Sequence, residues 1–180
     1  SLYLYLKYKD IPLKMDNNKN RLKLLIYFRK QLIKFLDELI GQFPKRGEFY
    51  FLRIFINDQV PIEVVLGRFI VEVLPYKYLV KNKDANLLLN SDIITDALIG
   101  NSSSDGSLKE NLEMADAMKN LWMDKNLTDE DRDTIWKWFD VFVTISEKYY
   151  NTYGCIDGWE VDIPAATQMI NKKYNIKVKD

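Results

Sequence analysis

The chain has 180 residues, of which 47% are hydrophobic, with 26 basic and 26 acidic side chains, one cysteine and no histidine. This length and composition are typical of a single globular domain. The lack of histidine excludes Ser-His and Cys-His nucleophile pairs and the usual His/Cys sites for zinc and copper. One thiol cannot form an internal disulfide, which fits a reducing compartment. We therefore expect an intracellular protein without a cofactor.

The charges are unevenly distributed although they sum to zero. Residues 1–60 carry twelve Lys/Arg and six Asp/Glu, whereas residues 84–147 carry five and fourteen. Either the two segments attract each other within one fold, or they form oppositely charged faces for a partner or for self-assembly. No apolar run approaches the about 20 residues that a membrane-spanning helix needs. We expect no membrane span.

The two ends of the chain have the pattern of short strands. In residues 1–9 leucines alternate with tyrosines and lysines, and residues 175–179 alternate in a similar way. A period of two is typical of a β-strand. Residues 1–15 are thus predicted to be an N-terminal arm or strand, and a small terminal β-ribbon with residues 175–179 is an optional addition to the fold.

A long amphipathic helix is predicted from about Asp16 to Phe43, with Gly41 and Pro44 as its stop signals. Its expected apolar stripe includes Leu22, Leu25 and Phe35. Several basic side chains lie off this stripe, where they form either a solvated face or a contact surface for phosphate or acidic partners: Lys19, Arg21, Lys23, Lys30 and Lys34.

Three segments follow in the middle of the chain. Residues 48–57 are strongly apolar and fit either a strand or a helix, and residues 61–74 fit a buried helix that begins at Pro61. Residues 75–83 are predicted to be a lysine-rich connection. Aromatic and basic side chains alternate there in a pattern that suits single-stranded nucleic acid: Tyr76, Lys77, Tyr78, Lys81 and Lys83.

The second half of the chain is predicted to be helical after a flexible loop at 101–106. Ser107 and Glu110 match a capping box. Thr128 is expected to cap a helix over about 129–152, which ends at Gly154. That helix carries two apolar stripes, so we expect it at the centre of the fold with neighbours on two sides. A last helix is predicted from about Asp162 to Lys173, and it contains Ala165, Ala166, Met169 and Ile170.

The acidic residues from Asp124 to Asp131 resemble a calcium loop only superficially. Asp129 occupies the position where the loop needs glycine, and Ile135 the position where it needs a bidentate glutamate. Helix capping accounts for the same acids. No metal site is predicted, and no catalytic residues are assigned.

Several short segments give the chain a resemblance to small uncharacterised α-helical proteins of large double-stranded DNA viruses of eukaryotes. The likeness covers roughly residues 35–153. The resemblance implies a viral protein made in an infected cell, in the host cytoplasm or the virion, and brings no catalytic residues. The segments are Phe43-Pro44, Val73-Leu74-Pro75, Val80-Lys81-Asn82-Lys83-Asp84, Leu121-Trp122, Leu127-Thr128-Asp129-Glu130-Asp131, Ile135-Trp136-Lys137-Trp138-Phe139 and Glu147-Lys148-Tyr149-Tyr150.

These observations predict an all-α, multi-helix bundle formed by residues 1–180 as one domain. The expected function is a non-enzymatic protein–protein interaction or structural subunit, with a protein partner or self-assembly. The alternative is a nucleic-acid-associated accessory factor that uses the basic helix at 19–34 and the 75–83 connection. An enzyme with a carboxylate or Ser/Lys site is the third hypothesis.

Overall fold

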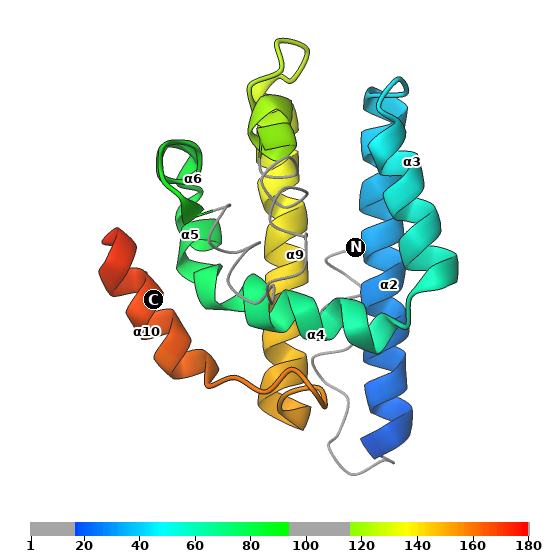
Figure 1. The fold of residues 1–180 in the computed structure, drawn as a ribbon, viewed down its shortest axis with the longest axis vertical. Coiled ribbons are helices and arrows are strands. Elements are labelled where there is room, and N and C mark those ends of the chain that lie inside the picture. Colours follow the sequence, from blue (N-terminus) through cyan, green and yellow to red (C-terminus); the bar gives the residue numbers. More distant parts are fainter. Residues whose placement is uncertain (1–16, 94–115, 180) are drawn as a thin grey trace, which may run out of the picture.

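The computed structural model describes residues 17–93 and 116–179, and this part of the chain is mainly α-helical (Figure 1). The prediction of a mainly α, multi-helix fold is confirmed. The elements are α2 (Asn17–Gln42), α3 (Gly47–Ile54), the π-turn η1 (Phe55–Gln59), α4 (Ile62–Glu72), the 3-10 turn η2 (Leu74–Tyr76), α5 (Lys77–Asn82), α6 (Ala85–Asn90), α9 (Asp129–Tyr153) and α10 (Ile163–Tyr174). Residues 116–122 are also helical.

The two long helices α2 and α9 stand side by side, and α4 crosses both of them (Figure 1). Helix α3 lies along α2 on the side away from α9, whereas α5, α6 and α10 lie on the other side of α9. Helix α9 contacts α2, α4, α5 and η2. The predicted central position of this helix is therefore confirmed.

The core is an aromatic cluster at the crossing of these three helices. Phe142 of α9 is almost completely buried, and its ring centroid lies 6.0 Å from that of Phe28 in α2 and 6.0 Å from that of Phe69 in α4. Ile135 and Trp136 represent the two predicted stripes of α9, and both are buried. Edge-to-face aromatic contacts of this kind add to the free energy gained by burial.

The ends of α9 follow the predicted signals. Thr128 Oγ1 accepts a hydrogen bond from the backbone N–H of Asp131 at 3.1 Å, and Asp131 Oδ2 accepts one from the backbone N–H of Thr128 at 2.9 Å. This capping box satisfies donors that a helix start leaves unpaired. At the other end Gly154 has a positive φ of 76°, which glycine adopts without strain.

The structure corrects the predicted apolar face of α2. Leu22, expected on the stripe of α2, is exposed, whereas Phe28 is fully buried. On α10, Met169 is 72% exposed, and Ile163 and Thr167 are the buried residues of that helix. The spacing of apolar residues predicts a helix, but the elements that pack against this helix determine which of its faces is buried.

Three secondary-structure expectations are also corrected. Residues 75–83 are not a connection, because η2 and α5 make most of this segment helical. The strand alternative for 48–57 is wrong, since α3 and η1 occupy it. Residues 175–179 form no strand, so the optional β-ribbon does not exist at that end; its proposed partner at 1–9 lies outside the described residues. The predicted loop at 101–106 and the Ser107/Glu110 capping box also lie outside them.

Candidate functional surfaces

Most of the basic residues predicted as contacts on α2 are on the surface. Lys19, Lys23, Lys30 and Lys34 are exposed. Arg21 differs, because its Nη1 donates a hydrogen bond to the hydroxyl of Tyr149 on α9 at 3.3 Å. This bond raises the pKa of the Arg21 guanidinium. Arg21 therefore links α2 to α9, and the four lysines remain the predicted contact residues on this helix.

The predicted contact residues on η2 and α5 interact more with other side chains of the same chain than those on α2 do. Lys77 Nζ lies 3.5 Å from Glu147 Oε1, and Lys83 Nζ lies 2.7 Å from Asp133 Oδ1. The bonds from Lys83 and Lys137 lower the pKa of the Asp133 carboxyl. Tyr76 and Tyr78 are half-buried, and Lys81 is exposed with its Nζ 5.2 Å from the ring centroid of Tyr78.

The two predicted sets do not form one surface. Helix α2 and helix α5 lie on opposite sides of α9 (Figure 1). A single ligand that covers both would have to wrap around α9. The structure therefore divides the predicted basic surface into an α2 part and an α5 part.

Sequence reasoning missed the lysines that α10 and the following residues bring to the α5 side. Asn82 Nδ2 at the end of α5 donates a hydrogen bond to the backbone oxygen of Lys177 at 2.8 Å. Leu79 of α5 and Ile176 are buried in one apolar cluster. The exposed lysines of α10 and of the residues after it are Lys172, Lys173, Lys177 and Lys179. The alternation at 175–179 was the only sequence signal, and we interpreted it as a strand.

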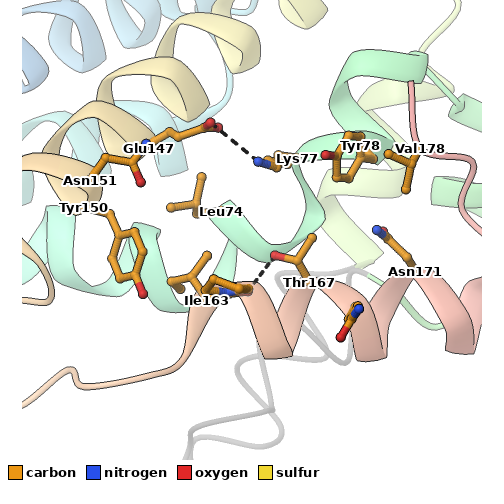
Figure 2. Close-up of a pocket in the computed structure, with 12 residues that line it drawn as sticks. Leu74, Lys77, Tyr78, Glu147, Tyr150, Asn151, Ile163, Thr167, Asn171 and Val178 are labelled. Carbon is orange, nitrogen blue, oxygen red and sulfur yellow. Dashed lines mark hydrogen bonds and ion pairs between the residues drawn. The ribbon is translucent and has the colours of Figure 1, made fainter. Parts of the chain in front are cut away.

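A cleft of about 310 Å³ lies between η2, α5, α9 and α10 (Figure 2). Leu74 and Ile163 are the buried apolar residues that line it, and Tyr150 of α9 and Tyr78 of α5 lie toward opposite ends. Polar side chains from α9 and α10 also line it: Glu147, Asn151, Thr167, Gln168 and Asn171. Asn171 Oδ1 is buried and has no hydrogen-bond partner.

A second unassigned feature is an apolar surface on α3 and η1, which we call the α3–η1 surface. Its side chains are exposed by between 37% and 69%, with Phe51 the most exposed: Tyr50, Phe51, Leu52, Ile54 and Phe55. No residue of α3 is buried, and the adjoining Ile56 of η1 packs with Leu36 and Leu39 of α2. The apolar composition of 48–57 was visible in the sequence, but its exposure was not.

The described residues contain no group of three or more Cys, Asp or Glu placed to hold a metal ion. Within the segment that resembles a calcium loop, Asp124 Oδ1 accepts the backbone N–H of Asn126 at 2.8 Å, and Asp131 belongs to the capping box. Cys155 Sγ and the backbone of Val161 exchange hydrogen bonds at 3.4 Å across a turn. These groups have structural partners.

Within the same described ranges, every helix is too short or too polar to cross a bilayer. The comparisons with family models, curated proteins and solved structures found no match to this chain.

Proposed function

We propose that the protein is a non-enzymatic interaction protein and structural subunit, which pairs with a second copy of itself through the α3–η1 surface. The observation that carries this proposal is the 69% exposure of Phe51 among four other exposed apolar side chains of the same surface. Large apolar side chains that cluster on a surface are typical of interfaces.

The apolar composition of α3 supports burial by another molecule. The segment reads GEFYFLRI, so apolar side chains surround most of the helix, yet α3 has no buried residue. A helix that is apolar all round is normally buried. Contact with α2 covers only a narrow side of α3, since Phe49 and Arg53 are its half-buried residues and the other residues of this helix are exposed. A second protein surface would remove the remaining apolar area from water.

The exposed area fits pairing with a second copy. Taking roughly 200 Å² for each large side chain, the exposed fractions of the five residues correspond to about 480 Å². Two such surfaces together bury about 950 Å² of apolar side chain, and neighbouring polar atoms bring the contact to the about 1,000 Å² expected of a specific interface. An interface at this lower limit predicts a weak, reversible dimer.

The charges that border the surface allow two copies to approach. Arg53 Nε donates to Asp37 Oδ1 of α2, and Arg46 lies 3.4 Å from Glu48 and 3.5 Å from Asp124. Each of these cations has an acidic neighbour within its own chain. Like charges therefore oppose pairing less than an unpaired set of arginines would.

The viral part of the proposal rests on the resemblance of residues 35–153 to proteins of large DNA viruses. On this proposal the chain acts in the cytoplasm of an infected cell or in the virion. Detection of the chain in purified virions by mass spectrometry, at an amount comparable to known capsid components, supports a structural subunit. Detection only in infected-cell extract contradicts a virion role.

The experiment is light scattering coupled to size exclusion over a range of protein concentrations. We expect the wild type to approach the mass of a dimer as concentration rises and Phe51→Glu to remain a monomer, because a buried charge opposes pairing. Met169→Glu is the matched control, since Met169 is 72% exposed and lies on α10, far from α3 (Figure 1). Equal masses for wild type and Phe51→Glu would contradict the proposal.

One specific observation on α2 supports the nucleic-acid alternative. Lys19, Lys23, Lys30 and Lys34 are exposed along α2 and have no ion pair within the described residues. We therefore propose, as the second candidate, that α2 binds phosphates. Loss of a salt-sensitive gel shift in the variant with Lys23, Lys30 and Lys34 changed to Gln supports it, and absence of any shift at low salt contradicts it.

A further inference from the structure

We infer that the N-terminal half of α2 binds the surface of an anionic lipid bilayer, with its lysines at the headgroups and Leu22 and Ile26 inserted between them. The inference rests on the second candidate function, in which α2 binds phosphates, and it names the lipid headgroup as their source. It does not rest on self-pairing through the α3–η1 surface. Three observations carry it: the charge of this half of α2, the side of the helix on which the lysines lie, and the two aliphatic side chains beside them.

The N-terminal half of α2 carries only positive charge. Between Asn17 and Leu36 the chain has six basic residues and no acidic one. Asp37, the first acid along the helix, is already bonded to Arg53 of α3. Glu38 accepts a hydrogen bond from Trp138 Nε1. Clusters of four to eight basic residues on an amphipathic helix are typical of segments that bind anionic lipid.

The exposed lysines share one side of α2 with two aliphatic residues, and we call this side the α2 strip. At 3.6 residues per turn its six members fall within roughly 120° of the helix circumference. They are Lys19, Leu22, Lys23, Ile26, Lys30 and Lys34, and all are exposed. Phe28, which is buried against rings of α4 and α9, lies on the opposite side of the helix. The strip therefore faces away from the core, and the N-terminal end of α2 extends past α4 (Figure 1).

The aliphatic side chains of the strip are exposed to water. Leu22 is 52% exposed and Ile26, one turn later, is 56% exposed. Both lie toward one edge of the strip, and the lysines occupy the rest of it. Helices that lie in a membrane interface combine apolar side chains, which enter the boundary between headgroups and acyl chains, with lysines that reach the headgroups. Lysine suits this place because its aliphatic stem can follow the apolar side chains while its ammonium group stays in water.

The composition of the strip favours a bilayer over a nucleic acid. Single strands are bound through aromatic side chains on which bases stack. The exposed residues between 18 and 34 include no aromatic one, and Tyr27 is only 8% exposed. Phosphates of a strand or a duplex would pair with the lysines but would leave Leu22 and Ile26 in water. A bilayer receives both kinds of side chain, and its fluidity accommodates their spacing.

Binding is measured on the full chain by flotation with two kinds of vesicle, one of phosphatidylcholine alone and one that also contains phosphatidylserine. We expect binding to the anionic vesicles that weakens as salt rises, and little binding to the neutral ones. A gel shift with single-stranded and duplex oligonucleotides runs in parallel. No binding to anionic vesicles at low salt overturns the inference. A gel shift together with that result would assign the lysines to nucleic acid instead.

A pair of charge variants locates the electrostatic part of the binding. Lys23→Gln with Lys30→Gln should weaken binding to the anionic vesicles by at least about tenfold. Lys45→Gln with Lys125→Gln is the matched control, because it removes the same charge from exposed positions outside α2. Equal losses in the two double variants would mean that overall charge, and not the α2 strip, attracts the vesicles, which overturns the inference.

A second pair tests insertion. Leu22→Ala with Ile26→Ala should weaken vesicle binding while its salt dependence stays the same, because all lysines are kept. Met123→Ala with Met169→Ala is the control, since these side chains are 68% and 72% exposed but lie outside α2. Unchanged vesicle binding in the α2 variant overturns the insertion of this pair.

Light scattering of the variant with Leu22 and Ile26 changed to Ala separates this inference from the proposed self-pairing. We expect it to form the same dimer as the wild type. A variant that loses both the dimer and vesicle binding would assign the two side chains to pairing and overturn the inference. Failure of the wild type to bind vesicles leaves the dimer measurement unaffected, so the two proposals fail separately.

A measurement on the wild type protects the test against variants that fail to fold. Spin-labelled lipid in small bicelles of the anionic composition should broaden the methyl resonances of Leu22 and Ile26. The methyl resonance of Met169 should stay sharp, because α10 lies on the other side of α9 (Figure 1). Sharp resonances of Leu22 and Ile26 at saturating bicelle concentration would contradict insertion.

Discussion

Gly67 of α4 lies against the indole of Trp159, so closely that a Cβ atom at position 67 would stand 2.9 Å from Trp159 Cδ1. This approach holds the segment between α9 and α10 against α4. Because a contact of 2.9 Å is shorter than Cβ atoms tolerate, we expect Gly67→Ala to lower the free energy of unfolding by about 1–3 kcal/mol.

Gly41→Ala is the control for that substitution, because a Cβ at position 41 in α2 meets nothing within 4 Å. Alanine is a better helix former than glycine, so this variant should gain roughly 0.5–1 kcal/mol. Urea denaturation of both variants measures the difference. Equal effects at the two positions would mean that Gly67 does not contact Trp159 in solution.

Phe142 joins α2, α4 and α9, and its loss should be the most damaging core change. The side chain is 1% exposed and contacts aromatic rings on all three helices. Phe142→Ala should reduce the free energy of unfolding by about 3–5 kcal/mol, whereas the exposed Leu22→Ala should change it by less than about 0.5 kcal/mol. Similar effects of the two changes in thermal or urea unfolding would contradict the central position of α9.

The capping box of α9 gives a prediction about acid stability. Hydrogen bonds from Thr128, and one from Gln42 Nε2 at 2.8 Å, hold the pKa of the Asp131 carboxyl below its ordinary value. A carboxyl with a lowered pKa in the folded state stabilises the fold above its unfolded pKa, and this contribution is lost as the pH falls through the folded pKa. Asp131→Asn should therefore be less stable than the wild type at neutral pH.

The stability difference between Asp131→Asn and the wild type should shrink as the pH falls below about 4. Urea unfolding at neutral and acidic pH measures it. Asp129→Asn is the control, since Asp129 is exposed in the same first turn but takes no part in the capping box. A difference that stays constant with pH would contradict the bonded state of Asp131.

Glu72 should show the opposite dependence on pH. Burial raises the pKa of its carboxyl, although Arg68 Nε donates to Glu72 Oε1 at 3.1 Å and acts in the other direction. A raised pKa in the folded state gives a contribution that is fully present below the unfolded pKa and is lost as the pH rises through the folded pKa. The free energy of unfolding of Glu72→Gln should accordingly rise relative to the wild type between about pH 4 and neutrality. A relative fall would mean that the Arg68 ion pair dominates.

The sequence predicts helices well where local signals are strong. The Thr128 cap, the two stripes of α9 and the glycine at 154 are all local features, and each is confirmed by the structure. Helix α5 was not predicted because its six residues are too few to show a period.

The candidate surfaces were harder to predict because they depend on tertiary contacts. Phe51 is exposed because α2 covers little of α3. The apolar run at 48–57 gives no information about this coverage. Lys77 and Asn171 both line the cleft. Residues so far apart in sequence come close together only through the packing of η2 against α10. Lys81 was a predicted contact residue, whereas Lys172 was not.

Sedimentation equilibrium of the wild type at low and high salt tests the proposed self-association most directly. Because the α3–η1 surface is apolar and its bordering charges are paired, we expect a monomer–dimer equilibrium whose constant changes little with salt. We expect Phe51→Glu to abolish it and Met169→Glu to leave it intact. A wild type that sediments as a monomer at every concentration and at both salt levels would contradict the account.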